Sequence, residues 1–225
     1  MTNDQRPIRL GIYGGSFDPI HLGHLLLAET CREACELDRV LFLPCGQSPH
    51  KPRGAIATGP QRAEMLGFAV AGDPRFGVCR IELERSGSSY TVETLRQLRV
   101  EHPDSELFFL MGADSLADLP LWREPQAILE LATIVAVNRG HRPPPDWTSL
   151  ESRLGPIVRD RVRLVTMPAI DLSATEIRER TGSGQSLRFR VPRAVEEYIR
   201  QSGLYQSGEV LAISGFSPVS HSRST

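Results

Sequence analysis

Short apolar runs alternate with longer stretches of mixed apolar and polar residues along most of the chain. The short runs are almost continuously apolar, which is typical of parallel strands covered on both faces. They predict strands at Ile8–Tyr13, Val40–Leu43, Phe76–Ile81, Leu107–Met111, Thr133–Val137 and Val162–Val165. The longer stretches predict helices at about 22–36, 60–71, 91–101, 124–131 and 147–154, and two more near 174–180 and 192–200.

This alternation predicts an α/β fold, a Rossmann-like, doubly wound and mostly parallel sheet of about six strands with flanking helices. We expect one domain over residues 1–205, with a small helical C-terminal part at about 172–205. Residues 206–225 are rich in Ser and Gly and have no periodicity, which predicts a disordered tail.

The composition is that of a soluble globular chain, with 40% hydrophobic and 24% charged residues among 225. The 26 basic and 27 acidic residues nearly cancel, so phosphate binding must be local, and neither nucleic acid nor a membrane is an expected partner. No apolar run approaches the roughly 18 residues of a membrane span, and no secretory signal begins the chain, so we expect a cytoplasmic protein. The 4 cysteines form no C-x-x-C pair and are expected to be structural or incidental.

The strongest chemical signal follows the first strand and reads Gly14-Gly15-Ser16-Phe17-Asp18-Pro19-Ile20-His21-Leu22-Gly23-His24. Paired glycines let the backbone approach a ligand closely, and the helix start beyond them leaves N–H groups for an anion. His21 and His24 are three residues apart, so both rings project from one face of the first helical turn. The string matches neither the dinucleotide fingerprint nor the P-loop. It predicts phosphate binding, although a capping role or an incomplete metal pair is also compatible with two histidines.

A second candidate opens the first of the two late helices and reads Leu172-Ser173-Ala174-Thr175-Glu176-Ile177-Arg178. Ser173 with Glu176 forms a capping box, and taken alone this favours helix initiation. Ser173, Thr175 and Arg178 can also gather at the helix entrance as hydroxyl and guanidinium donors. In combination with the histidine string, phosphate binding becomes the favoured interpretation.

The two strings resemble the H-x-G-H signature and the late Ser/Thr-rich helix of the α/β nucleotidyltransferases. Further segments narrow the resemblance: Pro49-His50-Lys51, Ser89-Tyr90-Thr91-Val92-Glu93-Thr94-Leu95, and Gly112-Ala113-Asp114-Ser115-Leu116, followed by Leu119 and Trp122. With them the chain resembles the bacterial nicotinate-nucleotide adenylyltransferase family from about residue 8 to residue 205. Ser16, Ser48 and Ala174 depart mildly from that family's pattern, which more often has Thr, Pro and Ser there.

The resemblance implies an enzyme that transfers AMP from ATP to nicotinate mononucleotide in NAD biosynthesis, forming nicotinate adenine dinucleotide and pyrophosphate. It implies an ATP site formed by Gly14, Gly15, Ser16, Phe17, His21, His24, Lys51, Ser173, Thr175 and Arg178. His21, His24 and Arg178 are the implied catalytic residues. It implies a nicotinate mononucleotide site formed by Ser89, Tyr90, Thr91, Gly112, Asp114, Trp122 and Arg123.

These residue types suit the implied reaction. The attacking 5′-phosphate is already an anion, so catalysis needs positioning and charge stabilisation rather than a general base. An indole such as Trp122 attracts a cationic pyridinium ring by stacking and cation–π interaction. Thr91 and N–H groups near Arg123 can donate to the nicotinate carboxylate, and Asp114 can accept from a ribose hydroxyl. Mg²⁺ is expected as the cofactor, held mainly by substrate phosphates without a dedicated protein metal site.

Several alternatives stay open. A related adenylyltransferase acting on nicotinamide mononucleotide or phosphopantetheine shares the histidine motif, and the Ser89–Thr91 and Trp122 region discriminates between them. A non-catalytic nucleotide sensor is disfavoured because it need not retain His21, His24 and Arg178. Nucleic-acid binding through the basic segment 138–142 gains little support from a near-neutral chain. We expect a monomer or a small homo-oligomer.

Overall fold

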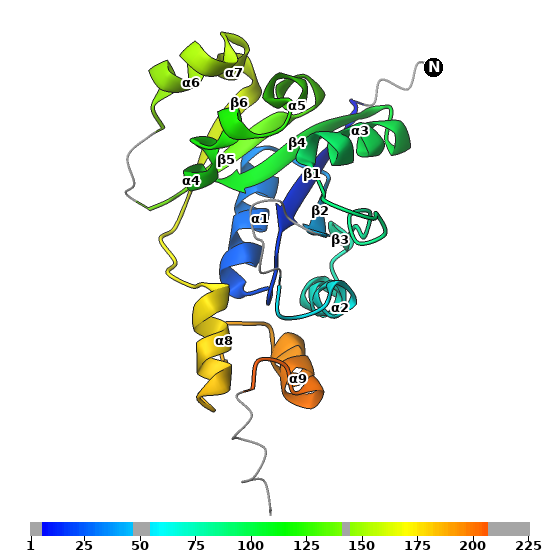
Figure 1. The fold of residues 1–225 in the computed structure, drawn as a ribbon, viewed down its shortest axis with the longest axis vertical. Coiled ribbons are helices and arrows are strands. Elements are labelled where there is room, and N and C mark those ends of the chain that lie inside the picture. Colours follow the sequence, from blue (N-terminus) through cyan, green and yellow to red (C-terminus); the bar gives the residue numbers. More distant parts are fainter. Residues whose placement is uncertain (1–5, 47–54, 141–144, 207–225) are drawn as a thin grey trace, which may run out of the picture.

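In the computed structural model, which describes residues 6–46, 55–140 and 145–206, six strands form one sheet in the order β3-β2-β1-β4-β5-β6 (Figure 1). Each neighbouring pair is parallel. The strands are β1 (Ile8–Gly15), β2 (Arg39–Pro44), β3 (Phe76–Val78), β4 (Ser105–Gly112), β5 (Thr133–Arg139) and β6 (Val162–Met167). The Rossmann-like, doubly wound α/β fold predicted from the sequence is confirmed.

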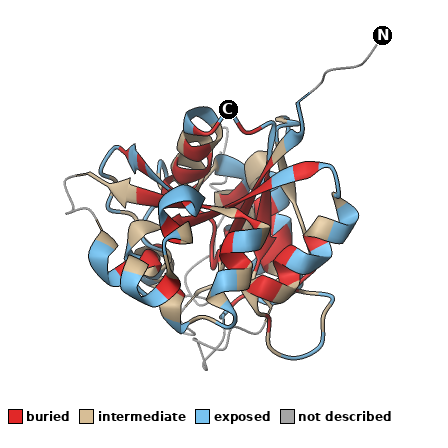
Figure 2. Cartoon of the chain, turned by 90° about the horizontal axis from the view of Figure 1, so that it is seen from above, coloured by how far each residue is buried: buried red, intermediate tan, exposed pale blue. Residues whose placement is uncertain are grey.

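Helices cover both faces of the sheet (Figure 2). The buried side chains form two clusters. One cluster takes residues from α1 (Leu22–Ala34), α2 (Gly59–Val70), α8 (Ala174–Gly182) and α9 (Arg193–Ser202). The other takes residues from α3 (Thr91–Glu101), α4 (Ala113–Leu116), α5 (Pro125–Leu131), α6 (Trp147–Leu154) and α7 (Ile157–Arg161). No helix in the described ranges has the length and apolar character needed to span a membrane.

The central strand β4 shows why the strand runs are continuously apolar. Phe108 and Leu110 belong to the cluster on the α1 face, whereas Phe109 and Met111 belong to the cluster on the α3 face. Successive side chains of a strand point to opposite faces, so a strand covered on both sides needs apolar residues at every position.

The observed elements differ from the predicted ones at the third strand and in three short segments. β3 ends at Val78 rather than Ile81, because the chain turns there and the Arg80 carbonyl accepts hydrogen bonds from the N–H groups of Leu83 (2.8 Å) and Glu84 (3.2 Å). The helices α4 and α7 and a 3₁₀ turn at Leu119–Leu121 were not predicted. They have 4, 5 and 3 residues, too few to show a helical period.

The strand order fixes where a ligand can bind. From β1 the chain passes to β2 on one side, while β4 lies on the other side of β1. The connections that leave β1 and β4 therefore run in opposite directions along the sheet. In open α/β sheets such a divergence leaves a crevice at the carboxyl ends of the strands.

The last two helices are attached beside this edge and lie together, far from α6 and α7 (Figure 1). On α9, the hydroxyl of Tyr198 donates to Glu64 of α2 at 2.5 Å, and Ile199 is buried in the α1-face cluster. The backbone N–H of Leu22, the first residue of α1, donates to the carbonyl of Arg190 at 2.8 Å. The segment between α8 and α9 therefore contacts the part of the chain that carries the histidine motif.

Candidate active site

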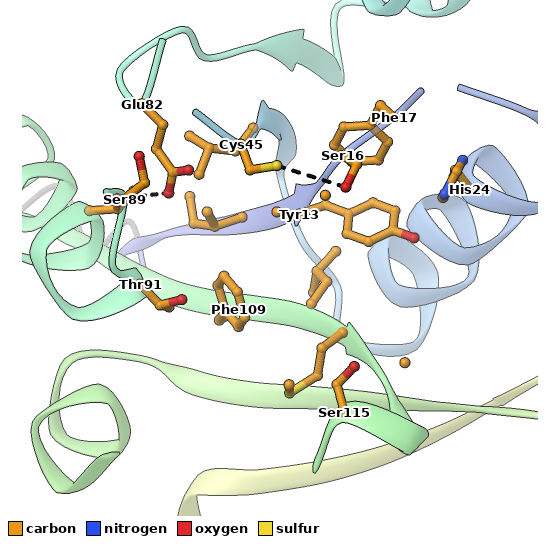
Figure 3. A pocket seen from close by; sticks show the side chains of 18 of the residues that line it. Tyr13, Ser16, Phe17, His24, Cys45, Glu82, Ser89, Thr91, Phe109 and Ser115 are labelled. Atoms are coloured by element: carbon orange, nitrogen blue, oxygen red, sulfur yellow. Dashed lines mark hydrogen bonds between the residues drawn. The ribbon is translucent and has the colours of Figure 1, made fainter. Parts of the chain in front are cut away.

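A cavity of about 770 Å³ opens at the carboxyl ends of β1, β4 and β5. Its wall combines the loop after β1, the start of α3, the segment after β4 and the start of α8. Figure 3 shows side chains from several of these segments converging on one hollow. The volume falls within the roughly 300–1,000 Å³ of typical small-molecule sites.

The loop after β1 is shaped by aromatic packing. A Cβ atom at Gly15 would lie 2.8 Å from the ring of Phe17, so only glycine lets that ring fold back over the strand end. Phe17 has a left-handed backbone (φ 47°), and its ring meets Tyr13 at 5.3 Å and His24 at 5.1 Å, both edge-on. Phe17 thus lines the cavity and also anchors the loop in the core.

The two histidines occupy different positions. Their rings stack with centroids 3.7 Å apart, and His24 lines the cavity whereas His21 is only 3% exposed and is not part of the cavity wall. The Nδ1 atom of His24 accepts the backbone N–H of His21 at 3.3 Å. An acceptor at Nδ1 leaves the proton of the neutral ring on Nε2. A Cβ at Gly23 would lie 3.1 Å from Nδ1 of His21, so glycine also makes room for the buried ring.

Burial changes the titration of His21. Desolvation, helped by the positive charge of Arg139, lowers the pKa of His21 from 6.5 to about 4. The ring is therefore neutral at pH 7.

Asp18 is buried beside the histidine motif and joins three separate segments. Its carboxylate accepts hydrogen bonds from the backbone N–H groups of Ile56 (2.7 Å) and Ala57 (3.0 Å) and from the hydroxyl of Tyr205 (2.7 Å). Its backbone carbonyl accepts from Arg178 at 2.7 Å. Asp18 was part of the recognised string, but its role as a connector was not predicted.

The start of α8 supplies part of the wall. Thr175 and Arg178 line the cavity, and Arg178 donates to the Thr175 hydroxyl at 3.1 Å. Ser173 is exposed, does not line the cavity, and accepts the backbone N–H of Glu176 at 3.1 Å. Its observed contact is the helix cap that the local sequence alone favoured.

The other end of the cavity is formed by α3 and the segment after β4. It contains the predicted residues Ser89, Tyr90, Thr91, Gly112, Trp122 and Arg123. Trp122 meets Phe109 edge-on with centroids 6.0 Å apart. The Arg123 guanidinium lies 4.6 Å from the centre of the Tyr90 ring and pairs with Glu93 at 3.0 Å, so its side chain is already engaged.

Besides His21 and Ser173, two further predicted residues are not found in the described wall, for different reasons. Asp114 is exposed at the start of α4 and does not line the cavity, although its neighbours Gly112 and Ser115 do. Lys51 lies outside the described residues. The predicted ATP-site residues Gly14, Gly15 and Ser16 all line the cavity.

The cavity also contains polar residues that sequence reasoning missed. Glu82 is 7% exposed and accepts the Thr94 hydroxyl (2.9 Å) and the backbone N–H of Gly46 (3.3 Å). Burial raises the pKa of Glu82, and these hydrogen bonds oppose the shift. Arg139 lines the wall at the end of β5. The available signal was position, since Arg139 comes two residues after the apolar run that ends at Val137.

Within the described ranges, no group of three or more His, Cys, Asp or Glu side chains is arranged to hold a metal ion. The cavity wall instead offers hydroxyl, imidazole and guanidinium groups, which are ligands for phosphate oxygens.

Comparison with known proteins agrees with the class that this fold and cavity define, a nucleotide-binding α/β protein. The model of the cytidylyltransferase-like family matches residues 12–180. Proteins named probable nicotinate-nucleotide adenylyltransferase are similar over most of their length. The one from Thermomicrobium roseum is 48% identical over 204 residues, covering 90% of this chain and 94% of the relative. The one from Thermus thermophilus is 48% identical over 199 residues, covering 88% and 100%.

Solved structures share the fold. The Plasmodium falciparum nicotinic acid mononucleotide adenylyltransferase complexed with NaAD superposes with a TM-score of 0.70 at 20% identity, covering 88% of this chain and 97% of that one. The chain belongs to the cytidylyltransferase-like family and, within it, to the nicotinate-nucleotide adenylyltransferases.

The buried His21 predicts a specific pH dependence of stability. The folded pKa of His21 is about 4 and its ordinary pKa is 6.5, so the unfolded chain binds a proton at His21 more readily than the folded protein does. The contribution of His21 to the free energy of unfolding is therefore fully present above pH 6.5 and is lost as the pH falls toward 4. Between pH 7.5 and 4.5 the wild type should lose roughly 2–3 kcal/mol more free energy of unfolding than His21→Asn. Urea denaturation of both proteins at the two pH values measures this difference. Equal losses of the free energy of unfolding in the two proteins would contradict the lowered pKa of His21.

Proposed function

We propose that this protein transfers AMP from ATP to nicotinate mononucleotide, forming nicotinate adenine dinucleotide and pyrophosphate in NAD biosynthesis. The observation that carries the proposal is a single cavity with two chemically different ends. One end presents Trp122, Tyr90 and Thr91, which suit a flat cationic ring, and the other presents His24, Thr175 and Arg178, which suit phosphates. The cytoplasm is the location that we propose for such an enzyme.

The reaction follows from placing both substrates in this cavity. An oxygen of the mononucleotide 5′-phosphate forms a bond to the α-phosphorus of ATP, and the bond from that phosphorus to the bridging oxygen of pyrophosphate breaks. The electron pair leaves with pyrophosphate, so the protein does not have to remove a proton. Its task is to align the two phosphates and to stabilise the charge that builds up between them.

His24 is the residue best placed to do this at the α-phosphate. Its Nδ1 atom is occupied by the backbone N–H of His21, so Nε2–H is the ring's donor. The neutral His21 ring stacks beneath it and fixes its orientation without carrying a charge itself. The catalytic role implied for His21 is thus exerted through His24.

Arg178 and Thr175 form the proposed contact for the β- and γ-phosphates. The Arg178 Nη1 atom is held by the Asp18 carbonyl, which sets the direction of the guanidinium plane. A fixed guanidinium loses little entropy when it binds a phosphate.

We propose that Mg²⁺ enters with ATP. Magnesium keeps several waters and commonly uses substrate phosphates as ligands, so the cavity residues need to hold the polyphosphate rather than the ion. When bound, the ion neutralises part of the phosphate charge.

One assay tests the function directly. Purified protein with ATP and Mg²⁺ receives nicotinate mononucleotide, nicotinamide mononucleotide or phosphopantetheine, and pyrophosphate and dinucleotide are measured. We expect turnover with the mononucleotides and the higher kcat/KM with the nicotinate form. Consumption of phosphopantetheine alone would refute the assignment, and no turnover with any acceptor would favour a nucleotide sensor.

His24→Ala should lower kcat by roughly 100- to 1,000-fold, the usual loss for one well-placed donor at a developing charge. The KM for nicotinate mononucleotide should change by only a few-fold, because His24 lies at the other end of the cavity. His102→Ala is the control, since His102 caps the far end of α3 outside the cavity wall. Steady-state kinetics on the folded variants measures both parameters. An unaltered kcat for His24→Ala would show that His24 does not contribute to catalysis.

Trp122→Ala should raise the KM for nicotinate mononucleotide by roughly 5- to 30-fold, the loss expected for one stacking and cation–π contact. The KM for ATP should be nearly unchanged. The chain has 2 tryptophans, and the other one, Trp147, stacks on Arg159 outside the cavity wall. Trp147→Ala is therefore a matched control, and equal effects of the two substitutions would argue against a ring contact at Trp122.

A further inference from the structure

The described cavity wall contains three arginines, which differ in how far their guanidinium groups are engaged by the protein. Arg178 donates to the Asp18 carbonyl at 2.7 Å and to the Thr175 hydroxyl at 3.1 Å. Arg123 pairs with Glu93 at 3.0 Å. Both side chains are therefore oriented by partners within the protein.

Arg139 has no comparable partner among residues 6–46, 55–140 and 145–206, which the structure describes. It is the last residue of β5, is half-buried and lines the cavity. Among the described residues, no carboxylate lies within ion-pair distance of its guanidinium, and its side chain donates no hydrogen bond. Withdrawing a cation from water without a counter-charge is unfavourable. A half-buried, unpaired arginine in a cavity wall therefore indicates that the counter-charge is supplied by a ligand.

The electrostatics place Arg139 at the histidine end of the cavity. After burial, the charge of Arg139 is the largest influence lowering the pKa of His21. The same charge opposes the upward shift that burial gives the pKa of Tyr13. Figure 3 shows the Tyr13 ring reaching from β1 toward His24, away from Ser89 and Thr91. Arg139 thus acts where the proposed phosphates lie and not where the pyridine ring lies.

We propose that Arg139 is a further binding residue for the polyphosphate of ATP, contributing a guanidinium that no described residue pairs with. The inference rests on the proposed function. A guanidinium presents a planar fork of donors that fits two phosphate oxygens at once, which a point charge cannot do. The basic segment 138–142 was considered above for nucleic acid. Its one described arginine, Arg139, lines the cavity and gains a different role there.

The test uses the full chain with Arg139→Gln and Arg139→Lys, and Arg161→Gln as the matched control. Arg161 is exposed at the end of α7 and does not line the cavity. Arg139→Gln should raise the KM for ATP roughly 10- to 100-fold, the range for losing a charged hydrogen-bonding pair, and should leave the KM for nicotinate mononucleotide within about two-fold. Arg139→Lys should recover part of the loss, and Arg161→Gln should behave as wild type.

A binding measurement separates the phosphate contact from a contact with the base. Isothermal titration calorimetry with inorganic triphosphate should show the same loss of affinity for Arg139→Gln as the KM for ATP, whereas adenosine affinity should not change. The slope of log K against log salt for triphosphate should also become shallower, because one phosphate-neutralising cation is gone.

Unchanged triphosphate affinity in Arg139→Gln would overturn the proposal, and so would a loss of adenosine affinity as large as that of triphosphate. If Arg139→Gln does not fold, Arg139→Lys carries the test, with an expected loss of roughly three- to ten-fold because the second donor of the fork is missing. Calorimetry needs no turnover. A wild type that binds triphosphate through Arg139 but makes no dinucleotide would therefore refute the proposed function and leave this inference standing.

Discussion

The buried carboxylate of Asp18 is the interaction on which the phosphate end of the cavity depends. A carboxylate removed from water needs hydrogen-bond donors, and here they come from the segment before α2 and from Tyr205 near the C-terminus. The carbonyl of the same residue orients Arg178 on α8. Segments separated by up to 187 residues are thus drawn to one point, directly beside the two histidines.

A buried arginine, Arg62, holds the strand-end loops of the cavity in addition to Asp18. Arg62 on α2 is 4% exposed and donates to the carbonyls of Ser16 (2.7 Å) and Cys45 (2.8 Å), which belong to the loops after β1 and β2. The guanidinium and the Asp18 carboxylate together fix the strand-end loops before any ligand arrives. Groups held in this way need little rearrangement to stabilise a developing charge, which is the condition for electrostatic catalysis.

The site was partly predictable because its motifs are local. Glycines at a strand end, histidines three apart and a hydroxyl-rich helix start imply their geometry from spacing alone, and most of these residues do line the cavity. The predictions were least informative about how deeply each side chain is buried. His21 and His24 share a helix face in the sequence, yet packing against Gly23 and the core buries one ring and leaves the other on the cavity wall.

The sequence by itself determined the order of strands and helices, the parallel sheet and the edge where the cavity lies. These follow from the continuously apolar runs of buried parallel strands, the 3.6-residue period of helices and the short-range chemistry of turns. Only the tertiary structure decided that Asp18 and Arg62 are connectors, that Glu82 is buried, and that Arg139 has no partner in the described part of the chain. Burial and charge pairing depend on residues brought together from distant parts of the chain, and no local pattern records which of them will meet.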